Sequence, residues 1–321
     1  MPARLPVLLL ALVLVACSSS YVPPPLVVAT PDELTAAVAP LTAGVEGGIL
    51  IGAGDIARSS EFPNAKATGD IIRAVLATKP DAMVFTAGDN AYQDGTVSNF
   101  QMYYEPAWGS FNGSTVPVPG NHDYRTPGAR PYFDYFDYYR ANPDARTRTY
   151  YSFDLEGWHI VSLNSNIAMG ARSAQVAWLD NDLANTSKRC ILAIWHHPRF
   201  SSGRQGAQAL DEGRRTGALW DTLLRYKADV IVNGHDHTYE RFARQDTRGT
   251  PSASGIRQFV VGTGGAVLRE FKSTKPNSEV RDNAHNGVLL LTLRPDSYEW
   301  AFIATDGVIY DRSAAPEACH D

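Results

Sequence analysis

Basic clusters, long apolar runs and internal repeats are all missing from this chain of 321 residues. Without a run of lysine and arginine, and with a formal net charge of −5, the chain offers no electrostatic surface for nucleic acid or another polyanion. The apolar stretch at residues 5–16 is too short to span a bilayer comfortably. With 44% hydrophobic and 20% charged residues, the composition is that of an ordinary globular protein, so we expect a folded body with a full core.

The amino-terminal segment has the features of an export signal. Arg4 precedes the apolar residues 5–16, and Cys17 follows them, with three serines after it. The sequence Leu-Val-Ala-Cys at 14–17 resembles the bacterial lipobox, which implies cleavage before Cys17 and a diacylglyceryl group on its thiol. Cleavage by a general signal peptidase is the alternative. We predict a signal peptide over 1–16 and an exported protein held at the cell envelope, on its periplasmic or extracellular side, by that lipid alone.

The positions of the prolines and cysteines suggest how the exported chain is organised. Residues 17–44 contain five prolines among small residues, which is typical of an extended tether, although 33–38 could form a short helix. We expect one domain over 45–321. Cys190 and Cys319 are the remaining cysteines, and in an oxidising compartment we expect them to form a disulfide, with two free thiols as the alternative.

Apolar patterns alternate between strand and helix along the rest of the chain, which is typical of α/β architecture. Helices are expected around 71–76, from Ser173 onward and over 217–226. Strands are expected at 48–53, 82–86, 116–118, 190–195, 229–232, 256–261, 288–293 and 298–303, with a hairpin at 150–164. Such a chain can build a four-layer αββα sandwich, in which two mixed β-sheets face each other and helices flank them.

Five short polar segments follow apolar strands in a fixed order. They are Gly54-Asp55, Gly88-Asp89-Asn90-Ala91-Tyr92, Gly120-Asn121-His122-Asp123, His196-His197-Pro198 and Gly234-His235-Asp236-His237. Each segment alone is weak, since a Gly-Asp pair also marks simple turns and helix caps. Together they offer oxygen and imidazole ligands for two adjacent metal ions, and strand ends can bring them to one point. The two histidines of the last segment would project the same way, because side chains repeat every two residues in a strand.

This order of segments resembles the calcineurin-like metallophosphoesterases, and within them the purple acid phosphatase branch. The pattern G-D, G-D-x-x-Y, G-N-H-D/E, a histidine after an apolar strand, and G-H-x-H is present from Asp55 to His237. The superfamily usually has a histidine two residues after the first aspartate, where this chain has Ala57. Tyr92 supplies a phenol where ordinary members lack one.

The resemblance implies a ligand set for two metals. One metal would take Asp55, Tyr92 and His237, the other Asn121, His196 and His235, and Asp89 would bridge both. A phenolate is a hard anionic ligand, so the first site is expected to hold Fe(III), and the second a divalent ion of iron, zinc or manganese. In isolation Tyr92 would be read as a core tyrosine.

The resemblance also implies an activity, with the remaining roles open. We predict a phosphoric ester hydrolase that cleaves small phosphomonoesters by attack of a metal-bound hydroxide, with His122 protonating the leaving group and Asp123 holding the loop. His197 could touch substrate, support the ligands or only pack, and Arg199 could clamp a phosphate or be a surface arginine. The alternatives are a phosphodiesterase acting on nucleotides or phospholipid headgroups, and a lipoprotein that binds metal or phosphate without turnover.

Two further segments are ambiguous. The aromatic run at 132–139 could line a pocket, but packing of a helix onto the core is the preferred interpretation. Gly262-Thr263-Gly264-Gly265 lacks the spacing of a nucleotide fingerprint, so we interpret it as a glycine-permitted turn.

Overall fold

The computed structural model of the protein describes residues 24–58, 62–204 and 216–321. The predicted signal peptide and the lipid-bearing Cys17 lie outside the described residues. In the part of the chain that is described, no helix combines the length and apolar character needed to cross a bilayer.

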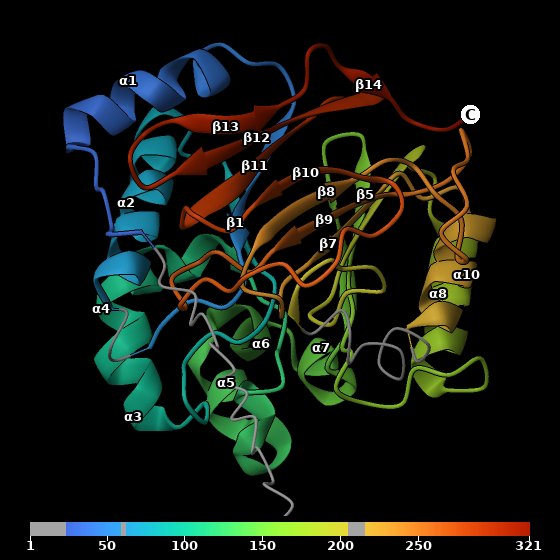
Figure 1. Cartoon of the computed structure of the whole chain (residues 1–321). Helices are drawn as coiled ribbons and strands as arrows, with labels where there is room; N and C mark the ends of the chain where they lie inside the picture. The colour runs from blue at the N-terminus through green and yellow to red at the C-terminus, as the bar shows by residue number, and fades with distance from the viewer. Residues whose placement is uncertain (1–23, 59–61, 205–215) are drawn as a thin grey trace, which may run out of the picture.

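The chain builds two mixed sheets of seven strands each (Figure 1). The first has the order β13 (Ile309–Arg312), β12 (Ser297–Ala304), β11 (Gly287–Leu293), β1 (Gly48–Ala53), β2 (Met83–Thr86) and β3 (Thr115–Val116), with β14 (Glu317–Ala318) paired to β12. The second has the order β10 (Ser278–Asp282), β8 (Tyr239–Phe242), β9 (Arg257–Val261), β7 (Val230–Asn233), β6 (Cys190–Ile194), β5 (Trp158–Ser162) and β4 (Tyr151–Leu155). Strands β1, β2 and β3 run parallel, and so do β5, β6, β7 and β9.

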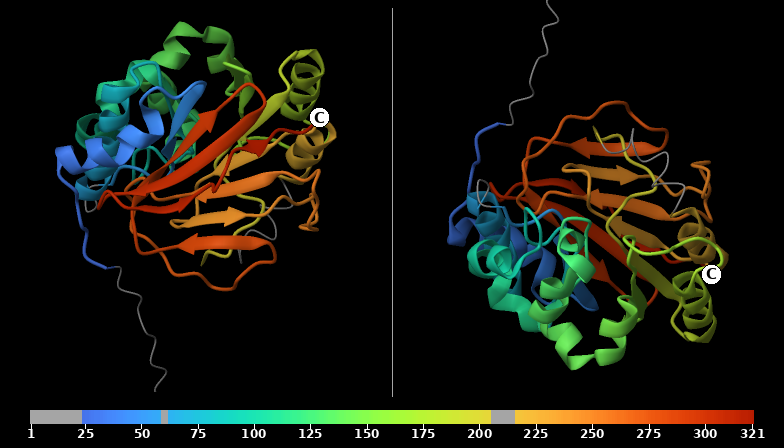
Figure 2. Two further views of the ribbon diagram at one scale, coloured as in Figure 1. Left: turned by 90° about the horizontal axis from the view of Figure 1, so that it is seen from above. Right: turned by 90° about the horizontal axis from the view of Figure 1, so that it is seen from below.

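Helices cover the outer face of each sheet, so the predicted four-layer αββα sandwich is confirmed (Figure 2). Helix α2 (Phe62–Thr78) packs on the first sheet, while α8 (Ala174–Asn185) and α10 (Gly217–Arg225) pack on the second. Strand β6 shows why both faces are apolar. Its Leu192 and Ile194 join the core between the sheets, whereas Ile191 and Ala193 contact the layer of α8 and α10.

Helix α1 (Pro31–Thr42) corrects the expectation of an extended tether as far as residue 44. Thr30 and Glu33 form a capping box, in which the Thr30 hydroxyl accepts the Glu33 N–H and the Glu33 carboxylate accepts the Thr30 N–H. Leu34 and Val38 are buried in the core, and α1 packs against α2. The folded body therefore begins before residue 30.

Short helical segments fill the chain between β2 and β4. They are α3 (Val97–Asn99), η2 (Phe100–Tyr104), α4 (Glu105–Trp108), η3 (Gly109–Ser114), η4 (Asp123–Arg125), η5 (Pro127–Ala129), α5 (Arg130–Tyr135), α6 (Asp137–Ala141) and α7 (Pro143–Arg148). The rings of Tyr132, Phe136 and Tyr139 are fully buried in the core, so the structure confirms that the aromatic run packs the fold together.

The two cysteines that the structure describes form a disulfide, as predicted. It joins Cys190 at the start of β6 to Cys319 in the carboxyl-terminal tail, with the Cα atoms 5.5 Å apart. Because the two residues are 129 positions apart in sequence, the bond closes a large loop of the unfolded chain and stabilises the fold.

Candidate metal centre

The predicted metal ligands come together at one edge of the sandwich, because they follow the carboxyl ends of parallel strands. Asp55 follows β1, Asp89 follows β2, and the segment with Asn121 follows β3 in the first sheet. His196 follows β6, and His235 follows β7 in the second sheet. Their contacts join the two sheets at this edge.

Four donor atoms form a first group around the Tyr92 hydroxyl. The Tyr92 hydroxyl donates to Asp55 Oδ1 at 2.7 Å and lies 3.0 Å from Asp89 Oδ2. His237 Nε2 lies 3.2 Å from the Tyr92 oxygen and 3.2 Å from Asp55 Oδ1. Donor atoms that share a metal at roughly 2.1 Å are about 3 Å apart, so this group has the spacing of a coordination shell.

Four donor atoms form a second group around His196. Its Nε2 lies 3.1 Å from Asn121 Oδ1, 3.2 Å from His235 Nδ1 and 3.4 Å from Asp89 Oδ2. The same oxygen of Asp89 therefore belongs to both groups. This is the arrangement that a carboxylate bridging two metals requires.

Backbone groups hold the ligands in place from behind. The second oxygen of Asp55 accepts the His235 N–H, and that of Asp89 accepts the His122 N–H, both at 2.7 Å. The Nδ1 atoms of His196 and His237 lie 2.8 Å from the carbonyl oxygens of Ala87 and Val267. Because a carbonyl oxygen can only accept, these contacts hold a proton on Nδ1, and Nε2 is the nitrogen that is left to bind a metal.

Three of the ligand residues have an unusual backbone conformation. The φ angles of Asp55, Asp89 and His235 are 58°, 53° and 71°, in the left-handed region that residues other than glycine seldom adopt. Strain of this kind persists where the surroundings impose it, and it is concentrated at functional sites. The sharp turn directs each side chain from its strand end into the centre.

The two buried carboxylates of the donor groups, Asp55 and Asp89, raise the pKa values of the ligands beside them. Burial and the neighbouring carboxylates of Asp55 and Asp89 raise the pKa of the Tyr92 phenol well above its usual range. Burial opposes protonation of His196, but the Asp89 and Asp55 carboxylates outweigh it and raise the pKa of His196 to about 9. In the described part of the chain, no lysine or arginine pairs with either aspartate. Oxygen and imidazole donors of this kind fit two hard or borderline cations.

His122 lies beside the bridging carboxylate. Its Nε2 is 3.9 Å from Asp89 Oδ2, while its Nδ1 is 2.7 Å from the carbonyl oxygen of Gln93. The imidazole ring packs on Tyr92, with ring centroids 4.4 Å apart. This places the Nε2 atom next to both donor groups, where a proton donor for a leaving group is needed.

Asp123 fastens the loops of two ligand segments together. Its buried carboxylate accepts hydrogen bonds from the Gly120 N–H at 2.8 Å and from the Asn90 side-chain amide at 2.9 Å. Burial and the charge of Asp89 raise the pKa of Asp123 to about 7. The predicted role in holding the loop agrees with these contacts.

The histidine and arginine assigned to substrate lie in different surroundings. The ring of His197 packs against His235 with centroids 4.5 Å apart, and its Nδ1 lies 2.7 Å from the Ser165 hydroxyl. Arg199 donates from Nε to the Thr247 carbonyl at 2.6 Å, and its guanidinium lies against Gly217 at the start of α10. His197 is thus joined to the donor groups, and a role for Arg199 in substrate binding stays a prediction.

The glycine-rich turn after β9 packs directly against the metal ligands. A Cβ atom at Gly262 would lie 2.0 Å from the Asp236 carbonyl oxygen and 2.9 Å from Asp55 Oδ2. Only glycine permits this approach. The segment is therefore a tight turn, as predicted, and it also supports the site.

Sequence reasoning missed three groups that hold the centre in place. They are the Ser165 hydroxyl, which binds His197, and the carbonyls of Ala87 and Val267, which orient His196 and His237. Every residue has a backbone carbonyl, so the sequence cannot indicate which carbonyls bind the histidines. Ser165 follows β5 and belongs to no recognisable motif. These contacts can be found only from the three-dimensional structure.

Comparison with known proteins agrees with the geometry. The sequence is 27% identical to purple acid phosphatase 21 of Arabidopsis thaliana over 66% of this chain and 52% of that protein, and 29% identical to purple acid phosphatase 15 over 55% and 38%. The chain thus spans about half or less of the length of these curated relatives. The resemblance to the purple acid phosphatases is confirmed.

Solved structures agree on the fold. The purple acid phosphatase PPD1 from yellow lupin (Lupinus luteus) matches with a TM-score of 0.70 at 19% identity, over 84% of this chain and 54% of that one. GAP50 of Plasmodium matches with a TM-score of 0.63 at 12% identity, over 85% and 89%. The sequence model described as calcineurin-like phosphoesterase covers residues 51–239, more than half of the chain and the whole span from Asp55 to His237. With all seven predicted ligands inside that span and gathered at one point, the chain belongs to the calcineurin-like phosphoesterase family.

Proposed function

We propose that the protein is a metal-dependent phosphoester hydrolase that acts on small phosphomonoesters. The observation that carries the proposal is the pair of donor groups that share Asp89 Oδ2, with the His122 imidazole 3.9 Å from that oxygen. The names of the relatives, purple acid phosphatases, support the choice of a monoester. Two metal ions bound by these groups would supply a nucleophile at moderate pH and offset the charge of the phosphoryl group.

The protein's own groups would position the reacting atoms. His122 holds its Nδ1 proton on the Gln93 carbonyl, so its Nε2 faces the centre and can carry the proton that the leaving oxygen takes up. His197, fixed by Ser165 and packed on His235, would orient the phosphate. A non-catalytic metal binder would need neither an acid beside the bridge nor the shared carboxylate.

Tyr92 supports a specific metal proposal. Its phenol contacts three other donor atoms in the first group, and its pKa is raised by burial and two carboxylates, so a strongly polarising cation is needed to bind it as phenolate. We therefore propose Fe(III) at this position and a divalent ion of iron, zinc or manganese in the other group. The test is metal analysis with a visible spectrum on wild type and Tyr92→Phe. An active but colourless and iron-free wild type would refute the iron assignment.

Parallel assays on an alkyl phosphomonoester and on its methyl diester test the substrate class. We expect the monoester to be turned over faster by at least about tenfold, and Asp55→Ala to abolish both reactions. His285→Ala, which changes a histidine outside the donor groups, is the matched control. Faster diester turnover would replace the monoester assignment, and a metal-loaded protein without any turnover would refute hydrolysis altogether.

We propose further that the protein is exported and anchored by a lipid on Cys17. The lipobox-like sequence at 14–17 supports this, and the disulfide between Cys190 and Cys319 is of the kind that persists in an oxidising compartment. Mass spectrometry of the amino-terminal peptide from isolated membranes tests the anchor. An unmodified Cys17, or a chain that retains residues 1–16, would refute it.

A further inference from the structure

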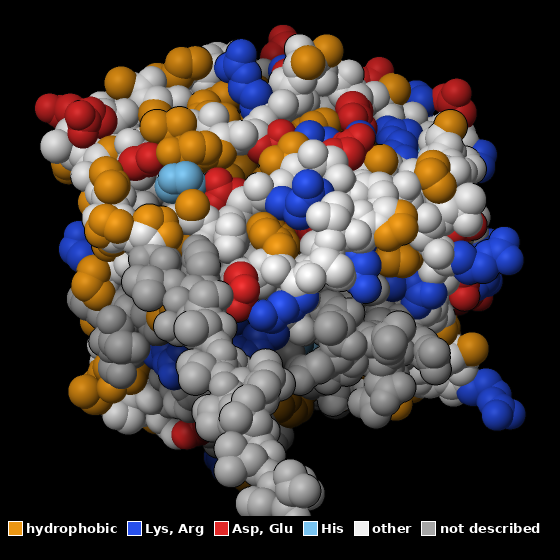
Figure 3. All heavy atoms as spheres, in the orientation of Figure 1, with side chains coloured by type: hydrophobic (Ala, Val, Ile, Leu, Met, Phe, Trp, Pro, Cys, Tyr) orange, Lys and Arg blue, Asp and Glu red, His pale blue; other side chains and the backbone are white. Residues whose placement is uncertain are grey.

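Exposed apolar side chains are concentrated on one part of the surface. Of eight large hydrophobic residues that are exposed in the described part of the chain, six belong to this region: Leu26, Val27, Val28, Val267, Val308 and Tyr310. Apolar side chains gather over this upper left part of the molecule in Figure 3, near α1 and the connection between β12 and β13. An exposed apolar cluster of this kind on a folded body needs an explanation.

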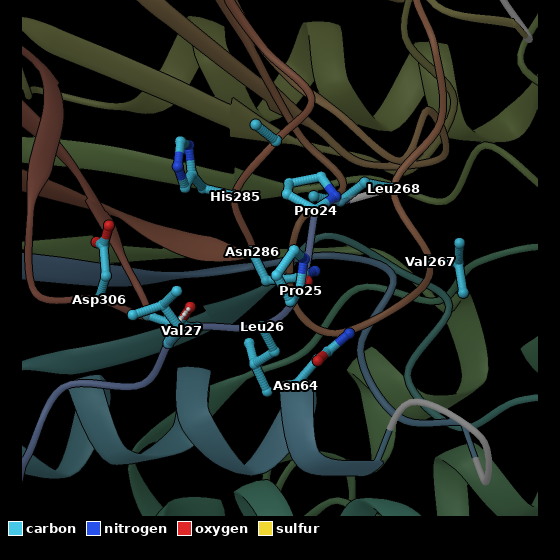
Figure 4. Close-up of a pocket in the computed structure, with 12 residues that line it drawn as sticks. Pro24, Pro25, Leu26, Val27, Asn64, Val267, Leu268, His285, Asn286 and Asp306 are labelled. Carbon is cyan, nitrogen blue, oxygen red and sulfur yellow. Dashed lines mark hydrogen bonds between the residues drawn. The ribbon is translucent and has the colours of Figure 1, made fainter. Parts of the chain in front are cut away.

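A cavity of about 250 Å³ links these residues into one surface (Figure 4). Leu26, Val27 and Val267 line it, together with His285 and Asp306. Val308 and Tyr310 contact residues that line the cavity. The His285 ring stacks on Tyr310 with centroids 3.9 Å apart, and the Asp306 carboxylate accepts the Val308 N–H at 2.9 Å and the Tyr310 hydroxyl at 2.8 Å.

The chain enters the folded body at this same place. Thr305 Oγ1 donates to the Val27 carbonyl at 2.9 Å, and the Ala29 N–H donates to the Thr305 carbonyl at 2.8 Å. These two bonds fix the segment that contains Leu26, Val27 and Val28 against the end of β12. The point at which residue 24 leaves the body is therefore set by the fold.

We propose that this surface, here called the entry face, contacts the lipid bilayer that holds acylated Cys17. The proposal rests on the proposed anchor and not on the catalytic activity. Cys17 and Pro24 are seven positions apart, and a fully extended chain over that distance reaches about 25 Å. A domain of this size is about 45 Å across, so the tether can bring the entry face to the bilayer but not the opposite face.

The chemistry of the entry face suits a bilayer surface. Aliphatic side chains and a tyrosine are the groups that insert at the boundary between headgroups and acyl chains. Asp306, which lines the cavity, and Asp282, which binds the His285 ring, each accept hydrogen bonds within their own loops. Because a diacyl lipid already anchors the chain, the contact would set the orientation of the domain rather than its affinity for the membrane.

The entry face is also close to the metal centre. The carbonyl oxygen of Val267, whose side chain belongs to the entry face, lies 2.8 Å from Nδ1 of the ligand His237. If the Val267 side chain contacts the membrane, a single hydrogen bond connects a residue at the bilayer surface to the metal ligand His237.

The experiment measures orientation on the acylated full-length protein in vesicles of phosphatidylethanolamine and phosphatidylglycerol. A fluorophore is attached at Val308→Cys on the entry face or, as a matched control, at Val97→Cys, another exposed valine located on α3. Cys190 and Cys319 are buried in their disulfide, and the thiol of Cys17 carries the lipid in the acylated protein, so none of the three native cysteines would react. We expect brominated lipids to quench the probe at 308 about twofold and to leave the probe at 97 unchanged, because a contacting side chain sits at the acyl boundary.

A pair of double variants tests whether the apolar side chains cause the contact. With the probe at Tyr310→Cys, Val27→Asp/Val308→Asp should lose the quenching, whereas Val97→Asp/Met102→Asp should keep it. Monoester turnover in detergent should be the same in both, which shows that the fold and the metal centre are intact. Equal quenching at 308 and 97, no quenching at 308, or a Cys17 without lipid in the native membrane would each overturn the proposal. None of these outcomes bears on whether the protein hydrolyses phosphoesters.

Discussion

Two clusters of polar groups lie at opposite ends of β9, one of them buried and the other half-buried, and the groups that balance their charge differ. At its carboxyl end, Gly262 packs against the metal centre, where Asp55 and Asp89 meet a phenol, an amide and imidazoles. At its amino end, Arg257 binds Glu317 at 2.6 Å and Glu279 at 2.7 Å.

The second cluster, here called the arginine network, is complete within itself. Arg241 donates to Asp311 at 2.7 Å, Trp300 Nε1 and the Tyr239 hydroxyl donate to the same carboxylate, and Arg244 lies near Glu317. Its three guanidinium groups face three carboxylates: Arg241, Arg244, Arg257, Glu279, Asp311 and Glu317. The network joins β8, β9 and β10 of one sheet to β13 and β14 of the other. A half-buried cluster in which arginines pair with every carboxylate serves structure. A cluster whose carboxylates pair with no lysine or arginine can bind a cation instead.

The largest effect should come from the bridging carboxylate. Asp89→Asn removes the oxygen that both donor groups share, so we expect kcat/KM for a monoester to fall by about 10³-fold or more. The metal-free variant should keep its free energy of unfolding within about 1 kcal/mol, since the change also relieves repulsion from Asp55. Steady-state kinetics and urea denaturation measure both quantities. Asp94→Asn, at a half-exposed aspartate nearby, is the control and should change neither.

The opposite result is expected in the arginine network. Arg257→Met leaves the partly exposed Glu317 and Glu279 without their main partner, so the free energy of unfolding should fall by about 2 kcal/mol while kcat/KM of the folded enzyme stays within about twofold. Arg248→Met, at an arginine that is 88% exposed, should cost less than about 0.5 kcal/mol. If the Arg257 variant lost activity without losing stability, the division between a structural and a chemical cluster would be wrong.

The two clusters also differ in how far the sequence predicts them. The position of the metal centre could be predicted because its polar segments follow strands, and parallel strands deliver their ends to one edge of a sheet. The assignment of each ligand is what the resemblance to the family implies. The arginine network could not, because it pairs residues from separate strands whose register only the folded structure defines. Arg257 and Glu317 are 60 residues apart, and no motif connects them.

Local rules explain the other differences between expectation and structure. The five prolines of residues 17–44 predict an extended tether with at most a short helix at 33–38, yet α1 runs from Pro31 to Thr42. Pro31 occupies the first turn, where its missing N–H costs nothing. The predicted strands agree with the structure to within about two residues at their ends, since glycine or polar residues bound their apolar runs. Strands β8, β10, β13 and β14 were not predicted, because they are short and most of them contain charged residues. The carbonyls that orient His196 and His237 have no counterpart in sequence, because every residue has one.

A smaller effect separates the groups within the metal centre. His122→Ala should leave the metal content unchanged, because its Nε2 is 3.9 Å from the nearest carboxylate oxygen and its Nδ1 is directed at Gln93. We expect kcat/KM to fall about 10²-fold for an alkyl phosphate, whose leaving oxygen needs a proton, and less than tenfold for an activated aryl phosphate. Equal losses on both substrates, with full metal occupancy, would show that His122 does not protonate the leaving group.

In a third cluster, which is half-buried, a proton on a histidine balances the charge of two aspartates, and this cluster should give the smallest effect. His159 on β5 bridges Asp154 and Asp182, with 2.8 Å from Nδ1 and Nε2 to the two carboxylates. Burial opposes the charge of His159, but its hydrogen bonds to the carboxylates of Asp182 and Asp154 outweigh burial and raise the pKa of His159 above its ordinary value of 6.5.

This raised pKa predicts a pH-dependent contribution to stability. Because the folded state binds the proton more tightly, the contribution should be fully present below about pH 6.5 and be lost as the pH rises through the folded pKa. His159→Gln should therefore destabilise the protein by about 1 kcal/mol more at pH 5.5 than at pH 9. The quantity to measure is the difference in the free energy of unfolding between the variant and the wild type at each pH. Groups that titrate elsewhere contribute equally to both proteins and cancel in this difference. His285→Gln, at a histidine that binds a single aspartate on the surface, is the control. A cost that is the same at both pH values would mean that packing, and not the proton, holds the two aspartates together.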